Sequence, residues 1–224
     1  MQPWVKLDTA KVPDNGGELR LMQRGTEFSI MAGPTELMNS RQSGSEEALA
    51  TLVCERLRGV AGLRMLIGGY GMGFTLRAGL RVLGPDARLT VAELVPEIID
   101  WARGPMAALT AGCLDDPRVT VVLADVAEVI RQGRGAYDAI LLDVDNGPDG
   151  LVRADNGRLY TTKGLTAAKA ALRPGGVLAV WSAAKDPKFA ARLHHAGFAV
   201  DEVGVRARSN GKGARHTIWF ATPR

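Results

Sequence analysis

The sequence contains little cysteine, few aromatic residues and no long apolar run. Its two cysteines, Cys54 and Cys113, lie far apart without Cys-x-x-Cys spacing, which argues against a disulfide framework and gives no support for a metal site. Aromatic residues make up 5% of the chain, so little material is present for stacking nucleic-acid bases. No apolar run reaches the roughly 18 residues of a membrane span, and the first residues lack the apolar core of a signal peptide. We therefore expect a cytoplasmic protein with no membrane partner.

Charge and histidine also exclude some functions. The net charge is +4, and part of the excess is the basic run "RARSNGKGAR" at residues 206–215, which we expect to be a solvated hairpin loop. The three histidines, at positions 194, 195 and 216, show no metal-ligand or nucleophile spacing, and we expect them at the surface or in strands. No G-x-S-x-G motif is present, which argues against a serine hydrolase.

What is present is ordinary for a folded protein. Hydrophobic residues make up 46% and charged residues 23% of the 224 residues, enough for one sizeable core. Residues 1–45 contain short alternating segments separated by glycine or proline, which predict a small antiparallel β meander. The sequence "SGSEEALATLVCERLRG" predicts a capped amphipathic helix after it.

The remainder, residues 46–224, alternates between apolar strands and helices. Strands are expected at 63–69, 88–95, 118–125, 137–144, 176–183, 199–207 and 215–223, and helices at 74–84, 96–109, 126–133, 162–176 and 186–198. This alternation predicts an α/β fold with a doubly wound, mainly parallel seven-stranded sheet, Rossmann-like, covered by helices on both faces. The last two strands are joined directly, so they should form an antiparallel hairpin at one edge.

Four glycines follow the first strand of this unit, in "MLIGGYGMGFTLRA". Ligands of doubly wound sheets bind beyond the carboxyl ends of the strands, especially at the first strand-to-helix turn, and glycine lets the backbone approach a ligand closely. Gly68, Gly69, Gly71 and Gly73 are therefore the expected cofactor-binding residues. Their spacing is G-x-G-x-G, which matches neither a dinucleotide fingerprint nor a P-loop.

Acidic residues end the next two strands. Glu93, followed by Leu94, is placed to accept hydrogen bonds from a ribose diol, and Asp125, followed by Val126, can receive the exocyclic amino group of a purine. Each acid alone could be a loop residue or a helix cap. The ordered set predicts a pocket for an adenosine-like group without a pyrophosphate.

These segments resemble the class I fold that binds S-adenosylmethionine, and within it the spermidine synthase family. The similar stretches are "MLIGGYGMG", "VAELVPEIIDWAR", "DDPRVTVVLADVAEVI", "YDAILLDVDNGPDG", "RLYTTKGLTAAKAALRPGGVLAVWS" and "ELMNSRQSGSEEALA", within a resemblance that covers roughly residues 15–220. The resemblance implies a transferase that uses S-adenosylmethionine or its decarboxylated form, and by analogy a homodimer.

Two motifs depart from the pattern of that family. The family's "GGGDGG" stands here as "GGYGMG", so its aspartate falls on Gly71, and its "DSSDP" becomes "DVDNGP", with Asn146 at the second acid. In the family the first of these acids helps to hold the amino end of the aminopropyl donor. Because an ammonium without a paired carboxylate is costly to bury, we predict methyl transfer to a small-molecule acceptor. The alternatives are aminopropyl transfer from decarboxylated S-adenosylmethionine to a diamine, and a non-catalytic nucleoside- or RNA-binding protein.

The fourth strand carries the expected catalytic groups. Asp143 matches the family's catalytic aspartate, and Asp145 follows it; a carboxylate there can orient an amine and receive its proton, although both could instead be solvated loop acids. A polar loop of some twenty residues comes next and contains Tyr160, which matches a family position near the substrate. Asn146, Tyr160 and Gln42 are the expected substrate residues, with Glu46 as an alternative to Gln42.

Overall fold

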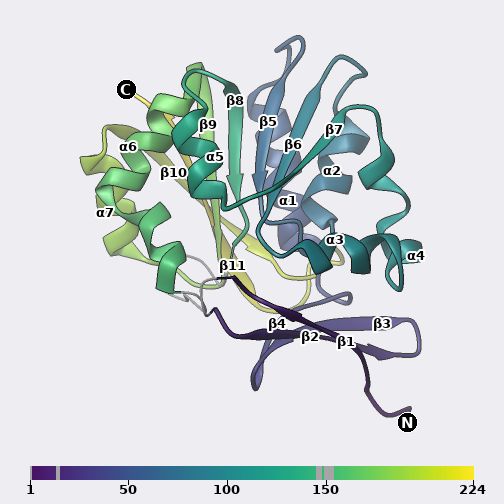
Figure 1. The fold of residues 1–224 in the computed structure, drawn as a ribbon. Coiled ribbons are helices and arrows are strands. Elements are labelled where there is room, and N and C mark those ends of the chain that lie inside the picture. Colours follow the sequence, from purple (N-terminus) through teal and green to yellow (C-terminus); the bar gives the residue numbers. More distant parts are fainter. Residues whose placement is uncertain (1, 14–15, 145–147, 149–153) are drawn as a thin grey trace.

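The computed structural model describes residues 2–13, 16–144, 148 and 154–224, and it contains two β-sheets (Figure 1). The small sheet is antiparallel, in the order β1-β2-β3-β4. Its strands are β1 (Val5–Lys11), β2 (Glu18–Arg24), β3 (Glu27–Ala32) and β4 (Thr35–Asn39). This is the predicted N-terminal meander.

The large sheet has the order β10-β11-β9-β8-β5-β6-β7. Its strands are β5 (Arg64–Gly68), β6 (Arg88–Glu93), β7 (Val119–Leu123), β8 (Tyr137–Leu142), β9 (Leu172–Ser182), β10 (Phe198–Arg206) and β11 (Arg215–Pro223). β5 to β9 pair in parallel, whereas β11 pairs antiparallel with both β9 and β10. The structure thus confirms the predicted seven-stranded, mainly parallel sheet and its terminal hairpin. The basic run falls in the turn between β10 and β11.

Helices cover both faces of the large sheet (Figure 1). The α-helices are α1 (Gly44–Arg56), α2 (Phe74–Val82), α3 (Pro96–Arg103), α4 (Ala107–Thr110), α5 (Val126–Gln132), α6 (Thr162–Ala171) and α7 (Pro187–His195), and the 3-10 helices are η1 (Cys113–Asp115) and η2 (Ala154–Tyr160). Successive residues of a strand face opposite sides of a sheet: Met65 and Ile67 of β5 join the core beneath α1, α2 and α3, whereas Leu66 joins the core beneath α5, α6 and α7. Among the described residues no helix is long and apolar enough to cross a bilayer.

Three local expectations were wrong. The helix expected at 96–109 is divided into α3 and α4, because Gly104 and Pro105 interrupt it and a residue before proline is disfavoured in helical geometry. The helix expected to reach Pro174 ends at Ala171, and β9 already begins at the next residue. The side chain of Ser43 makes no capping hydrogen bond to α1.

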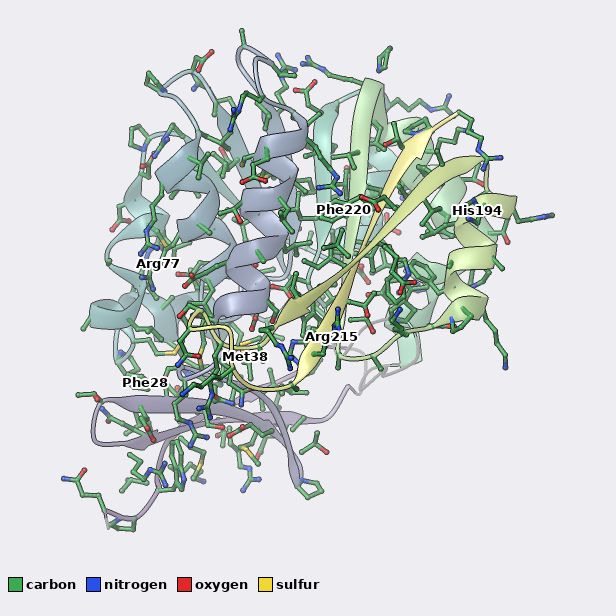
Figure 2. All side chains as sticks on the ribbon, turned by 180° about the vertical axis from the view of Figure 1, so that it is seen from behind. Phe28, Met38, Arg77, His194, Arg215 and Phe220 are labelled. Atoms are coloured by element: carbon green, nitrogen blue, oxygen red, sulfur yellow. The ribbon has the colours of Figure 1, made fainter. Side chains whose placement is uncertain are left out.

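The small sheet packs against the large sheet at the end where the parallel strands terminate. Leu21, Phe28 and Ile30 are buried in the same hydrophobic core as α1, α2 and α3, and Trp101 of α3 donates its indole N–H to the Asp8 carboxylate of β1 at 2.7 Å. Figure 2 shows Phe28 and Met38 where the two sheets meet. The meander therefore lies over the carboxyl ends of the parallel strands.

Candidate active site

The candidate site lies where the strand order of the large sheet reverses direction. The chain runs from β5 outward through β6 to β7 and then returns to β8 on the other side of β5. At such a switch point the loops after the two neighbouring strands diverge and leave a crevice. The glycine turn follows β5, and Asp143 follows β8.

The glycine turn needs a backbone that other residues seldom adopt. Gly69, Gly71 and Gly73 have φ angles of 82°, 56° and 76°, in the left-handed region that ordinary L-residues seldom adopt. The Gly69 N–H donates to the carbonyl of Ala92 at 2.9 Å, which ties the turn to the end of β6. The turn is thus shaped by the protein itself.

The four glycines of the turn face two different environments. Gly69 and Gly71 line a cavity, and their contact with a cofactor remains a prediction. Gly68 and Gly73 are not among the residues of its wall. A Cβ at Gly68 would lie 3.0 Å from Val126 Cγ2, and a Cβ at Gly73 would lie 2.6 Å from the hydroxyl of Tyr70.

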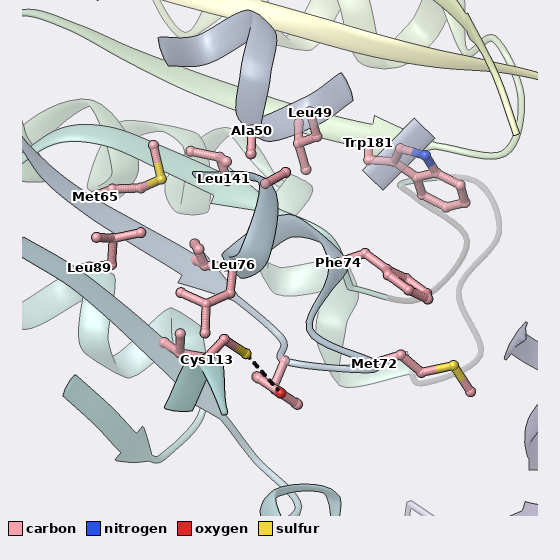
Figure 3. Packing of buried hydrophobic residues seen from close by; sticks show 14 of the residues in the cluster. Leu49, Ala50, Met65, Met72, Phe74, Leu76, Leu89, Cys113, Leu141 and Trp181 are labelled. Atoms are coloured by element: carbon pink, nitrogen blue, oxygen red, sulfur yellow. Dashed lines mark hydrogen bonds between the residues drawn. The ribbon is translucent and has the colours of Figure 1, made fainter. Parts of the chain in front are cut away.

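The buried side chain of Tyr70 packs against the glycine turn at Gly73. Its side chain is 5% exposed, and its hydroxyl lies 3.4 Å from the Cys113 thiol, the contact drawn as a dashed line in Figure 3. Burial raises the pKa of both groups. Cys113 is therefore a packed, buried thiol. The described residues contain no cluster of metal-binding side chains.

Glu93 is buried at the end of β6 and is held by backbone amides. One carboxylate oxygen accepts from the Tyr70 N–H at 2.8 Å and the other from the Val95 N–H at 2.9 Å. Burial raises the pKa of Glu93, while these backbone N–H groups lower it. The backbone N–H groups of Leu94 and Gly71 lower this pKa as well, and Glu93 lines the cavity.

The cavity has a volume of about 160 Å³, more than ten times the roughly 10–15 Å³ that one water molecule needs. One wall of the cavity is formed by Leu94 and Val95 after β6, by Ile98 of α3, and by Asp125 and Val126 at the start of α5. The small sheet and the loop between β1 and β2 contribute a second, largely apolar wall. That wall consists of Val12, Gly16, Leu19, Ile30, Ala32, Leu37 and Met38.

Asp125 has structural partners as well as a place in the wall. Its side chain caps α5 by accepting from the Ala127 N–H at 2.8 Å, and it forms an ion pair with Arg158 at 3.2 Å. The helix-cap interpretation of this acid is therefore correct. Asp125 also lines the cavity. Its contact with a purine remains a prediction.

Asp143 lies on the cavity wall immediately beyond β8. Its carboxylate accepts from the Thr75 hydroxyl at 2.8 Å, and the same hydroxyl contacts the backbone carbonyl of Glu46 at 3.3 Å. Burial raises the pKa of Asp143. Burial also raises the pKa of Glu46, and the neighbouring Asp143 charge raises it further.

Gln42 and Tyr160 are not among the residues that line the cavity. Gln42 lies in the turn before α1, where its N–H donates to the Asn39 carbonyl at 3.4 Å, and it is absent from the cavity wall. Tyr160 is 3% exposed; its hydroxyl donates to the Val144 carbonyl at 3.4 Å and its ring packs edge-on against Phe189. Tyr160 is thus packed next to the loop that carries Asp143. Asp145 and Asn146 lie outside the described residues.

Sequence reasoning missed Thr75 and the wall formed by the small sheet. It also missed what fills the space beside Gly71: a Cβ there would lie 2.6 Å from Met38 Cε and 2.8 Å from its sulfur. A thioether thus occupies the position toward which a side chain at Gly71 would extend. No local pattern marks these contacts, because each joins segments that are distant in the sequence.

Curated relatives with similar sequences share part of this chain. A polyamine aminopropyltransferase from Corynebacterium efficiens is 37% identical over 135 residues, which is 59% of this chain and 25% of the relative. Polyamine aminopropyltransferase 1 from Streptomyces coelicolor is 34% identical over 157 residues, or 66% of this chain and 28% of the relative. The chain therefore matches only about a quarter of the length of these relatives.

The comparisons contradict the predicted methyl transfer. Both of these relatives are named for aminopropyl transfer, so the reaction ranked second by the sequence is the one that the comparisons support. The crystal structure of a spermidine synthase with the transition-state analogue AdoDATO has a TM-score of 0.74 and 19% identity, covering 98% of this chain and 72% of the other. It confirms the fold. Residues 64–195 match the spermine/spermidine synthase domain, and the chain belongs to that family.

Proposed function

We propose that this chain transfers an aminopropyl group from decarboxylated S-adenosylmethionine to a small amine. The observation that carries the proposal is the position of Asp143, which lines the same cavity as Glu93 and Gly69. The cavity can thus hold a nucleoside next to a proton acceptor. The aminopropyltransferase names of the relatives support the same reaction.

The residues of the cavity suit the nucleoside part of such a donor. The apolar side chains of Leu94, Val95 and Ile98 suit an adenine ring, and an acid at the end of the second parallel strand, here Glu93, suits a ribose diol. Gly69 and Gly71 have no Cβ to obstruct the approach of the ligand to the backbone. The donor itself supplies a sulfonium centre, which makes the adjacent carbon electrophilic.

Asp143 would orient the acceptor and take up its proton. The nitrogen lone pair of the acceptor forms a C–N bond to the carbon beside sulfur, the C–S bond breaks, and its electron pair leaves with the thioether. The alkylated nitrogen then releases one proton. Asp143, the cavity-lining acid that follows β8, would accept it. General-base assistance of this type contributes about 10²–10⁴-fold, and alignment of the reactants supplies much of the rest.

The test compares donors and acceptors directly. Wild-type protein is titrated with decarboxylated S-adenosylmethionine, S-adenosylmethionine and methylthioadenosine in a thermal-shift assay, in which a ligand of the native state raises the melting temperature. Putrescine turnover is then followed with each of the two donors. We expect a larger shift and product formation with the decarboxylated donor.

Asp143→Asn is the informative variant, and Asp138→Asn is its matched control. Asp138 lies at the opposite end of β8, where it accepts from the Arg64 N–H. We expect Asp143→Asn to lower turnover by about 10²–10⁴-fold while retaining methylthioadenosine binding. Transfer of a methyl group alone, or turnover that is equal in the two variants, would refute the proposal.

A further inference from the structure

A second acid is linked to Asp143 through Thr75, and its own side-chain contacts hold it in place. Glu46 lies in the first turn of α1, and its carboxylate accepts from the Ser45 hydroxyl at 2.5 Å. Ser45 is fully buried. Its hydroxyl in turn lies 2.9 Å from Nδ1 of His216 on β11, so a continuous chain of hydrogen bonds runs from β11 to Glu46.

The start of α1 is fixed against the β10–β11 turn. The Gly44 N–H donates to the Ala207 carbonyl at 2.9 Å, and a Cβ at Gly44 would lie 2.4 Å from the Arg208 backbone. Only glycine fits this approach. The imidazole of His216 is positioned as well, because its ring packs edge-on against Trp181 with centroids 4.9 Å apart.

The hydrogen-bond chain can serve either protonation state of Glu46. A hydroxyl has one proton to donate. When Ser45 donates to the Glu46 carboxylate, Nδ1 of His216 must donate to Ser45; when Glu46 is protonated, it can donate to Ser45, which then donates to Nδ1. Glu46 can therefore gain or lose a proton without leaving a buried hydroxyl unpaired.

Glu46 and Asp143 form one acidic pair. The Thr75 hydroxyl joins the Asp143 carboxylate to the Glu46 backbone, and two neighbouring carboxylates in a buried site resist carrying two negative charges. The charge of Glu47, on the same helix, also raises the pKa of Glu46, and the His216 imidazole lies on the other side of Ser45. The turn after β5, residues 69–73, contains no acidic residue. Met38 fills the space beside Gly71.

We infer that Glu46 is a further functional residue of the transfer reaction: together with Asp143 it holds the proton that the acceptor nitrogen releases. Ser45 and His216 are positioning residues that fix its carboxylate. The inference rests on the proposed aminopropyl transfer. In that reaction one proton leaves the nitrogen and enters the pair, which needs one unprotonated carboxylate at the start and passes the proton to water after product release.

The test uses the full chain and the putrescine assay with decarboxylated S-adenosylmethionine. We expect Glu46→Gln to bind methylthioadenosine within about twofold of wild type and to lower kcat/KM at least tenfold. Because burial and the Asp143 charge raise the pKa of Glu46, Glu46→Gln should remove one ionisation from the kcat/KM profile and so change its shape.

The His216 variants provide a second, independent readout. His216→Leu removes the N–H donor, whereas His216→Asn keeps one near the Nδ1 position; we expect Leu to lower kcat and Asn to restore most of it. His195→Asn on the exposed surface of α7 is the matched control, and it should behave as wild type. If Glu46→Gln failed to fold, this pair of variants would decide the question.

The outcomes separate the two proposals. Wild type that is inactive with the decarboxylated donor overturns both. Active wild type with an unchanged rate and pH profile in Glu46→Gln, or with equal rates in His216→Leu and His216→Asn, overturns the role of Glu46 alone.

Discussion

Gly73→Ala tests whether the protein core shapes the glycine turn. At φ = 76° an alanine costs about 1 kcal/mol. Its Cβ would also lie 2.6 Å from Oη and 2.8 Å from Cζ of Tyr70, and this ring is buried, so that it cannot swing away into solvent. Overpacking of this type adds about 1–3 kcal/mol. We therefore expect a total destabilisation of about 2–4 kcal/mol.

The assay is urea denaturation, with Gly175→Ala as the matched control. Gly175 has φ = 78°, and a Cβ there would meet nothing within 4 Å, so the control isolates the backbone cost of about 1 kcal/mol. In a protein of this size the extra loss for Gly73→Ala corresponds to roughly 2–4 °C in melting temperature per kcal/mol.

A double-mutant cycle identifies the atoms responsible. Tyr70→Leu removes the outer ring atoms that the new Cβ would meet, so the cost of Gly73→Ala should fall by about 1–3 kcal/mol in that background. Equal costs for Gly73→Ala and Gly175→Ala, or a coupling energy near zero, would refute the conclusion that Tyr70 shapes the turn.

Three further predictions concern the cavity and its acids. Gly71→Ala should cost only about 1 kcal/mol of stability, because the flexible end of Met38 can move away. The same variant should bind methylthioadenosine at least tenfold more weakly, as measured by calorimetry. Unchanged binding would contradict the proposal that the ligand lies against the Gly71 backbone. Glu93→Gln should lose about 1–3 kcal/mol in denaturant titrations, since its amide N–H₂ would face a backbone N–H, and it should also weaken nucleoside binding. The pKa of Glu46 is raised from 4.5 to about 8, so its contribution to the free energy of unfolding is complete below pH 4.5 and is lost as the pH rises through about 8. Wild type should therefore lose stability relative to Glu46→Gln over this pH range. Free energies of unfolding that change in parallel with pH in the two proteins would contradict this prediction.

The sheet and the carboxyl-end acids could be predicted from the sequence because each depends on local pattern. β5, β6 and β8 are apolar on both faces, as expected for central parallel strands. Glu93 and Asp143 directly follow such strands, and parallel strands place their carboxyl ends at one edge. Connectivity alone therefore brings these two acids to one cavity.

The remaining features depend on contacts between distant segments. The capping pattern at the start of α1 indicated a helix, but it could not show that Ser45 meets His216, 171 residues later. Likewise, the missing acid at Gly71 suggested methyl transfer because the count of charges was made within one motif. That count cannot include Glu46, an acid of α1 that is linked to Asp143 through the Thr75 hydroxyl.

The small sheet has a consequence for inferring specificity from family membership. Its four strands end at Asn39, whereas the family match begins at residue 64. One wall of the cavity is therefore encoded outside the shared domain, and substitutions there can alter which molecules fit without changing any family motif. Two members with identical glycine turns can differ in selectivity for this reason, and swapping the meander between them would transfer the preference.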